Sequence, residues 1–134
     1  MATTKNEELV IKFFETLSRG DLEGVRAMFH KDATWQAMAR DIPGAGTHSG
    51  RDVIIDEFLG PIRGEFEPGD PKVEVKNIVS KGPMVMAECK GTGRLKNGKE
   101  YDNDYAWAVE IKNGKVFAIR EYMDTHYVYK LFFE

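Results

Sequence analysis

The chain has 134 residues, a formal net charge of −3 and a single cysteine. This length fits one domain whose core needs no disulfide or metal staple, so we expect a single domain over residues 1–134. The near-neutral charge argues against a nucleic-acid surface, and no apolar run approaches the roughly 18 residues of a membrane span. The polar first residues and the unpaired Cys89 predict a cytoplasmic protein that binds neither nucleic acid nor membrane.

The first thirty residues predict two helices. Thr4 and Glu7 have the spacing of a capping box at the start of the first helix. Gly20 is placed to end that helix in a left-handed cap, and Asp21 can cap the second. Apolar residues at helical spacing follow each cap, so both helices should bury one face against a common core.

A strand, a loop and a third helix are expected next. Alternating apolar residues indicate a strand over residues 32–38, and glycines and Pro43 indicate a loop over residues 41–50. The third helix should run from about Arg51 to Gly60 and end at Pro61, because proline lacks the backbone donor that a helix needs.

After Pro71 the hydrophobic period changes to two, which predicts four strands. These are expected at residues 73–79, 84–95, 99–111 and 115–127. Asn97-Gly98 and Asn113-Gly114 are typical hairpin turns, so the last three strands should be antiparallel neighbours. Helices followed by a sheet define an α+β fold.

The loop at Asn113-Gly114 permits two registers for the last hairpin. A two-residue loop pairs Lys112 with Lys115, whereas a three-residue loop with Gly114 as a bulge pairs Ile111 with Lys115. Only the second register separates apolar from polar side chains, so the sequence favours it. It gathers on one face Tyr105, Trp107, Val109, Phe117, Ile119 and Met123.

This register places Glu121 on the apolar face, opposite Tyr105. A carboxylate in such surroundings should have a raised pKa, which suits a general acid or base near neutral pH. The same loop at Asn97-Gly98 pairs Cys89 with Tyr105 and Gly91 with Asn103, a possible hydrogen-bond donor. Alternatively, Glu121 faces solvent or pairs with Arg120 or a partner chain.

Two glycines lie on the same face as Asn103. Gly91 and Gly93 leave that face short of side chains, which we interpret as room for a ligand.

Several short segments, in this order, resemble the SnoaL-like branch of the nuclear transport factor 2-like superfamily, which includes ketosteroid isomerase and limonene-epoxide hydrolase relatives. They are residues 13–17, 20–22, 29–35, 50–52, 113–116 and 120–124. The resemblance covers nearly the whole chain. It implies a cone-shaped fold in which three N-terminal helices pack on a curved mixed or antiparallel sheet around an apolar pocket.

The resemblance places Glu121 at the position of an acidic residue that helps activate water in the epoxide hydrolases. The other residues of that site fall on Trp35, Ala37, Cys89 and Gly91, and are therefore missing. The ketosteroid isomerase site is matched even less well, because its catalytic residues fall on Phe13, Ala37 and Ala106. Neither reaction can be transferred to this chain.

We therefore predict an enzyme of the isomerase, cyclase, dehydratase or epoxide-hydrolase type, acting on an apolar carbonyl or epoxide compound without cofactor or metal. The predicted catalytic residues are Glu121, Tyr105 and Asn103. The predicted substrate-binding residues are Phe14, Leu17, Trp35, Phe58, Cys89, Trp107, Ile119 and Met123. The alternative is a non-catalytic binding protein for a small hydrophobic ligand.

Other features leave alternatives open. The apolar tail over residues 128–133 either covers the pocket or packs on a second subunit, and a homodimer through the exposed sheet face is expected. His48 lies in a loop that can reach the pocket mouth, although a solvated role is the commoner one. Asp124 either serves the site or pairs with a neighbour. Three scattered histidines have no metal-ligand spacing.

Overall fold

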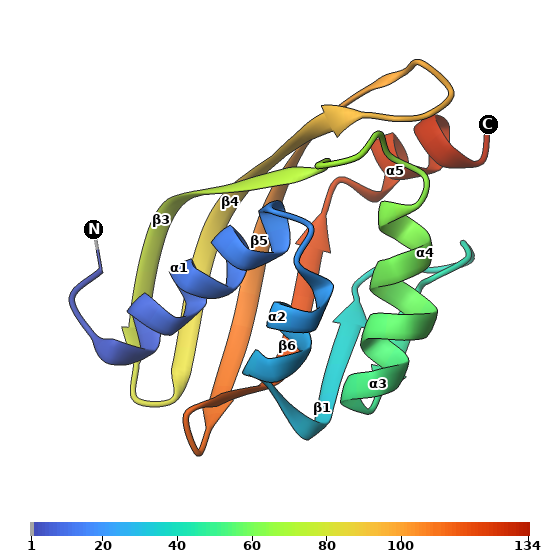
Figure 1. Ribbon diagram of the computed structural model, residues 1–134. Coiled ribbons are helices and arrows are strands. Elements are labelled where there is room, and N and C mark those ends of the chain that lie inside the picture. The colour runs from blue at the N-terminus through green and yellow to red at the C-terminus, as the bar shows by residue number, and fades with distance from the viewer. Residues whose placement is uncertain (1) are drawn as a thin grey trace.

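The computed structural model describes residues 2–134 as a curved six-stranded sheet with helices on its concave face (Figure 1). In chain order the elements are α1 (Lys5–Ser18), α2 (Leu22–Met28), β1 (Phe29–Ala37), β2 (Gly46–Ser49), α3 (Arg51–Val53), the π-helix η1 (Ile54–Leu59), α4 (Gly60–Arg63), β3 (Lys72–Lys81), β4 (Met84–Arg94), β5 (Glu100–Lys112), β6 (Lys115–Met123) and α5 (Thr125–Phe132).

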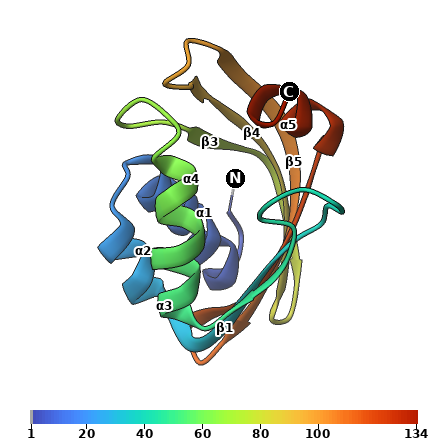
Figure 2. The same cartoon turned by 90° about the vertical axis from the view of Figure 1, so that its right-hand side faces the viewer.

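The strands follow the order β2-β1-β6-β5-β4-β3. β1 and β6 run parallel, and every other neighbouring pair is antiparallel. Figure 2 shows the sheet curving around the helices, with α5 and the loop before β2 on the open side opposite α4. The α+β cone with three N-terminal helical segments on a mixed sheet is therefore confirmed.

The predicted helix caps are present. The Thr4 hydroxyl accepts a hydrogen bond of 3.1 Å from the Glu7 amide, and the Asp21 carboxylate accepts one of 2.9 Å from Gly24. Gly20 has a φ of 75°, the left-handed conformation that ends α1.

The third helix does not end at Pro61. α3, η1 and α4 form one continuous helical stretch, in which the Gly60 amide bonds to the Ile55 carbonyl. A wider π turn just before the proline accommodates its ring and its missing donor, so the helix continues to Arg63.

The strand ends also differ from the prediction. β1 begins at Phe29 rather than residue 32, and β2 forms inside the predicted loop by pairing with β1. β6 stops at Met123, because Asp124 accepts a hydrogen bond of 3.0 Å from the Tyr127 amide and starts α5. Residues 125–127, predicted as strand, are therefore helical.

The predicted register of the last hairpin is wrong along its length, and Tyr105 does not pair with Glu121. Lys112 pairs with Lys115, so the loop has two residues, and Asn113 and Gly114 both have positive φ. A bulge then follows, because Ile111 pairs with Val116 and Glu110 with Ala118, which leaves Phe117 as the extra residue.

Because the bulge shifts the pairing by one more residue, the side chains beyond it lie on the faces that the sequence predicts. Beyond it Trp107 pairs with Glu121 and Tyr105 with Met123, so these side chains share the concave face. Phe117 is the exception: it packs its ring edge against His30 at 5.1 Å, outside the main core cluster. The β4–β5 register is confirmed, with Cys89 opposite Tyr105 and Gly91 opposite Asn103.

The core lies between α1 and the concave face of the sheet. Phe13 is fully buried at its centre, with ring centroids 5.4 Å from Phe14, 5.4 Å from Phe29 and 6.5 Å from Trp35. Its edge-to-face contacts with Phe14 and Phe29 add to the energy of burial.

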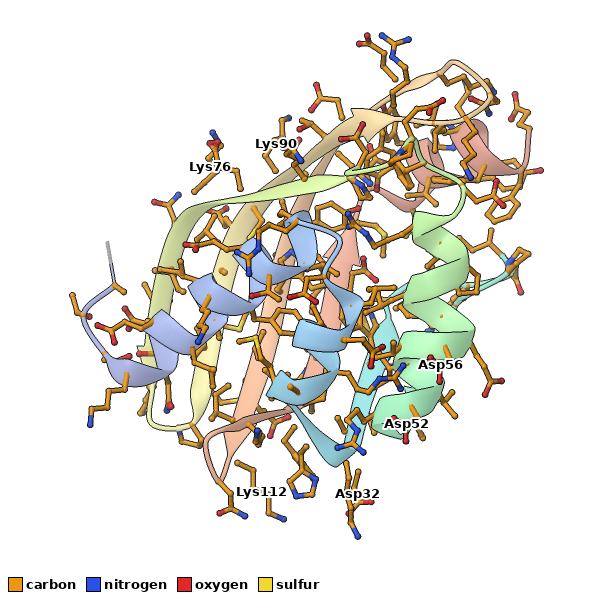
Figure 3. The ribbon with its side chains drawn as sticks, in the orientation of Figure 1. Asp32, Asp52, Asp56, Lys76, Lys90 and Lys112 are labelled. Carbon is orange, nitrogen blue, oxygen red and sulfur yellow. The ribbon has the colours of Figure 1, made fainter. Side chains whose placement is uncertain are left out.

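An ion-pair cluster ties α2 to the third helical stretch. The Arg26 guanidinium lies 2.7 Å from both Asp52 and Asp56, whose side chains are labelled in Figure 3. These pairs raise the pKa of Arg26 and lower that of Asp52, so both side chains stay charged. The cluster holds α3 and η1 against α2 at the wall of the cone.

Two phenylalanines test this description of the core. We expect Phe13→Ala to lower the free energy of unfolding by about 3–5 kcal/mol, because it empties a fully packed site. Phe117→Ala, at the half-buried bulge, should cost less than about 1.5 kcal/mol. Urea denaturation of the two variants measures both values, and equal losses would contradict the bulged register.

Candidate functional site

A cavity of about 500 Å³ opens at the wide end of the cone. Its walls come from the concave sheet face, the third helical stretch, the loop after β1 and the helix α5, whose positions Figure 2 shows. Most lining residues are apolar or aromatic. They include Ala37, Ile42, Phe58, Ile62, Phe66, Tyr101, Tyr105, Met123, Val128 and Phe132.

Glu121 lies at the inner end of this cavity. It is half-buried on β6, and its Oε1 accepts a hydrogen bond of 3.0 Å from the indole Nε1 of Trp35. The parallel pairing of β1 with β6 sets Trp35 opposite Ile119 and the small Ala37 opposite Glu121, so the indole can reach the carboxyl group. Arg120 does not pair with Glu121, because its guanidinium bonds to Glu110 at 2.7 Å.

Burial raises the pKa of Glu121 to about 7, and the hydrogen bond from Trp35 offsets only part of that effect. Neutral pH is therefore close to the pKa of Glu121, so both its protonated and its ionised form are populated. A carboxyl group in this condition can both take up and release a proton.

A pair of phenols faces the same cavity from β5. The hydroxyls of Tyr101 and Tyr105 are hydrogen-bonded to each other, and the Asn103 amide donates to Tyr101 at 3.1 Å. Burial raises the pKa of Tyr101 to about 12 and that of Tyr105 well above its ordinary value, and the nearby Glu121 acts in the same direction. Both phenols therefore remain protonated and can act as donors.

The structure divides the predicted site residues between cavity and core. Four line the cavity: Glu121, Tyr105, Phe58 and Met123. The others lie outside its lining: Asn103 is buried behind Tyr101, and the remaining side chains belong to the core cluster beneath, namely Phe14, Leu17, Trp35, Cys89, Trp107 and Ile119. Trp35 nevertheless touches Glu121, so it acts on the site from the core side.

The predicted room beside the two glycines is occupied by protein atoms. A Cβ at Gly91 would lie 2.7 Å from the Tyr105 ring, and one at Gly93 would lie 2.8 Å from Asp70. These glycines let neighbouring side chains approach the strand closely. The ligand space lies further along the cone.

The prediction missed the cavity's outer wall. Residues 42–45 of the loop after β1 line it, and there His48 bonds to the Gly44 carbonyl at 2.8 Å and stacks on Phe58 at 4.0 Å. Tyr101 was missed although it has the same strand parity as Tyr105, which was a usable signal.

The tail covers the cavity. Val128, Phe132 and Phe133 of the C-terminal segment line it, and Asp124 serves as the α5 cap rather than a site residue. Tyr127 fastens α5 to β5, because its hydroxyl accepts from the Asp102 amide at 3.0 Å and donates to the Glu100 carbonyl.

The described residues 2–134 contain no cluster of three or more His, Cys, Asp or Glu side chains arranged to hold a metal ion. Over the same residues, no helix has both the length and the apolar character needed to cross a membrane. Asp102 and Asp104 point away from the cavity, and both pair at 2.9 Å with Lys90, which is labelled in Figure 3.

Comparison with known families identifies the class of protein. Residues 10–119 match the SnoaL-like domain family, so the chain belongs to that family. No curated protein sequence matches the chain.

Solved structures show the same fold over nearly the full length. TerC, co-crystallized with polyporic acid, is 20% identical with a TM-score of 0.82, covering 96% of this chain and 98% of its own. Bal32a, from a soil-derived mobile gene cassette, is 26% identical with a TM-score of 0.81, covering 96% of each chain. A putative isomerase from Bacillus subtilis is 17% identical with a TM-score of 0.81, covering 98% of this chain and 96% of its own.

The pKa of Glu121 predicts a pH-dependent stability. The folded state binds this proton more tightly than the unfolded state, where the pKa is about 4.5. The contribution of Glu121 to stability is therefore greatest below pH 4.5 and is lost as pH rises to about 7. The difference between these pKa values corresponds to at most about 3 kcal/mol. Relative to Glu121→Gln, wild type should therefore lose up to about 3 kcal/mol between pH 4.5 and pH 8.

Urea denaturation of both proteins across this pH range measures the difference. Glu15→Gln, on the exposed face of α1, is the matched control for removing one carboxylate. A difference between wild type and Glu121→Gln that does not change with pH would show that Glu121 is not desolvated.

Proposed function

We propose that this protein is a small-molecule enzyme in which Glu121 acts as general acid and base on an apolar substrate that carries a carbonyl or epoxide group. The observation that carries the proposal is the Glu121 carboxyl group, with a pKa of about 7, at the inner end of a largely apolar cavity of about 500 Å³. A perturbed carboxyl group in a pocket is a typical feature of catalytic sites.

For a carbonyl substrate, the chemistry is a proton transfer. The Glu121 carboxylate removes a proton from the carbon beside the carbonyl, and the electron pair moves to the carbonyl oxygen. A phenol from the Tyr101 and Tyr105 pair stabilises that oxygen. Return of the proton to another carbon completes an isomerisation. Attack of the enolate carbon on a second carbonyl of the same substrate would instead complete a cyclisation, in which the C=O π bond opens and its oxygen takes the proton back from Glu121. Neither path needs an organic cofactor or a metal.

The neighbours agree with a small-molecule role. TerC was crystallized with polyporic acid, and the Bacillus subtilis neighbour is a putative isomerase. Both are too distant in sequence to transfer a substrate, so they support the type of site and no more.

The alternative is a binding protein in which Glu121 only holds the ligand. The lack of the epoxide-hydrolase residues favours it: Ala37, Cys89 and Gly91 stand where the resemblance to those enzymes implies polar residues. A test must therefore separate turnover from binding.

Exchange of α-protons for deuterium in a panel of apolar enones and ketones, followed by proton NMR at pH 7, tests the catalytic proposal. Glu121→Gln should slow exchange by at least about 100-fold, the usual contribution of a general base. Glu15→Gln should leave the rate unchanged. Ligand binding without any Glu121-dependent exchange, and without epoxide opening, would favour the binding protein.

We further propose a homodimer through the outer face of the sheet. Val79, Met86 and Tyr122 are 65%, 42% and 40% exposed there, and a shallow groove lies beside Met86. Face-to-face contact of two copies would cover the same patch on both, as a two-fold axis requires.

Met86→Lys should convert the dimer to a monomer in sedimentation-velocity measurements, because it buries a charge in the apolar contact. Tyr129→Lys, at a similarly exposed aromatic residue on α5, should leave the dimer intact. A monomeric wild type at micromolar concentration would contradict the dimer.

A further inference from the structure

The orientation of one buried amide limits where the protons of the phenol pair can point. Asn103 is 2% exposed, and its Oδ1 accepts a hydrogen bond of 2.9 Å from the Asp104 amide. Because this contact identifies the oxygen, the group 3.1 Å from the Tyr101 hydroxyl is the amide nitrogen, which can only donate. The Tyr101 proton therefore cannot point at Asn103.

The two phenols then have one hydroxyl proton that is not donated in any hydrogen bond. Tyr101 and Tyr105 contribute two hydroxyl protons, and the hydrogen bond between them uses one. Among the described residues no other group accepts from either hydroxyl, since Asn103 donates. The spare proton is left at the cavity surface that both phenols line.

The surroundings make an unused donor here costly. Tyr105 stacks on Trp107 with ring centroids 5.0 Å apart, and Tyr101 packs edge-to-face on Phe66 at 5.2 Å. Phe132 of α5 packs against both rings, with its centroid 6.0 Å from Tyr101 and 5.8 Å from Phe66. In such apolar surroundings an unmade hydrogen bond is expensive, so a ligand that supplies an acceptor gains affinity.

The charges around the cavity indicate what kind of acceptor fits. Glu57, Glu65 and Glu121 line it, and none of the described lining residues is Lys or Arg. A carboxylate or phosphate ligand would meet three carboxyl groups and neither Lys nor Arg, whereas a neutral oxygen would accept the phenolic proton at little electrostatic cost.

We propose that Asn103 directs the spare proton of the Tyr101–Tyr105 pair into the cavity, where it binds the carbonyl oxygen of a neutral, apolar ketone. Asn103 is thus a positioning residue that does not touch the ligand, and Tyr101 joins Tyr105 as a direct contact. This inference deepens the proposed function and rests on the same cavity, but it concerns binding and requires no turnover.

Two naphthalene probes of similar shape test the proposal. 2-Acetonaphthone has a ketone oxygen and 2-ethylnaphthalene has none, and quenching of Trp35 and Trp107 fluorescence reports their binding. Wild type should prefer the ketone by about tenfold, the usual gain from one satisfied hydrogen bond. The infrared carbonyl band of the bound ketone should lie at lower frequency than in hexane.

Four variants test the roles of the two phenols and of Asn103. The double variant Tyr101→Phe/Tyr105→Phe should lose the preference and return the carbonyl band to its position in hexane. Each single Tyr→Phe variant should keep most of the preference, because one phenolic proton remains. Asn103→Asp should abolish it when ionised at pH 9, because a carboxylate accepts the Tyr101 proton and reverses the chain.

Tyr122→Phe, on the outer sheet face, is the matched control, and Glu121→Gln should keep the preference even if turnover is lost. Equal affinity for both probes, no binding of either, or an unchanged carbonyl band in the double variant would overturn the proposal. None of these binding results would decide the catalytic role of Glu121, which the deuterium-exchange experiment tests separately.

Discussion

The contact between Trp35 and Glu121 joins the core of this protein to its cavity. It exists because β1 and β6 are parallel neighbours, although more than eighty residues separate the two side chains. Trp35 is 1% exposed and packs against Phe13, Phe29, Phe58 and Trp107, so the donor is held rigidly. The carboxyl group is therefore buried in a defined position, and its pKa near 7 is a consequence of the packing rather than of a neighbouring charge.

The two ends of the cone have different roles. At the narrow end buried aromatic rings pack between α1 and the sheet. At the wide end small residues such as Ala37 and Gly44, together with the detour of the loop after β1, keep the cavity open. α5 then closes part of that opening, held by its Asp124 cap and by Tyr127 on β5. A polar site in dry surroundings results, and this suits electrostatic stabilisation of a developing oxyanion.

The alternation of side chains along β5 and β6 predicted the shared face of Glu121, Tyr105 and Trp107, yet the reason differed from the one inferred. A two-residue turn followed by a bulge at Phe117 has the same effect on parity as the predicted three-residue turn. Two differences of one residue thus add up to a shift of two, which changes the pairing partners but leaves each side chain on its predicted face, because the period of a strand is two. The same alternation contains Tyr101, whose role becomes visible only from its contact with Tyr105 and Asn103.

The sequence by itself determined the fold class, the helix caps, the β4–β5 register and the face on which Glu121 lies, because each depends on local spacing and turn chemistry. Tertiary structure decided which of the predicted residues line the cavity and which form the core beneath it. It also decided the helical state of residues 125–132, the walls supplied by the loop after β1 and by α5, and the donation from Trp35 to Glu121. These depend on how distant segments pack, and hydrophobic periodicity marks a side chain as inward-facing without saying whether protein or ligand fills the space beside it.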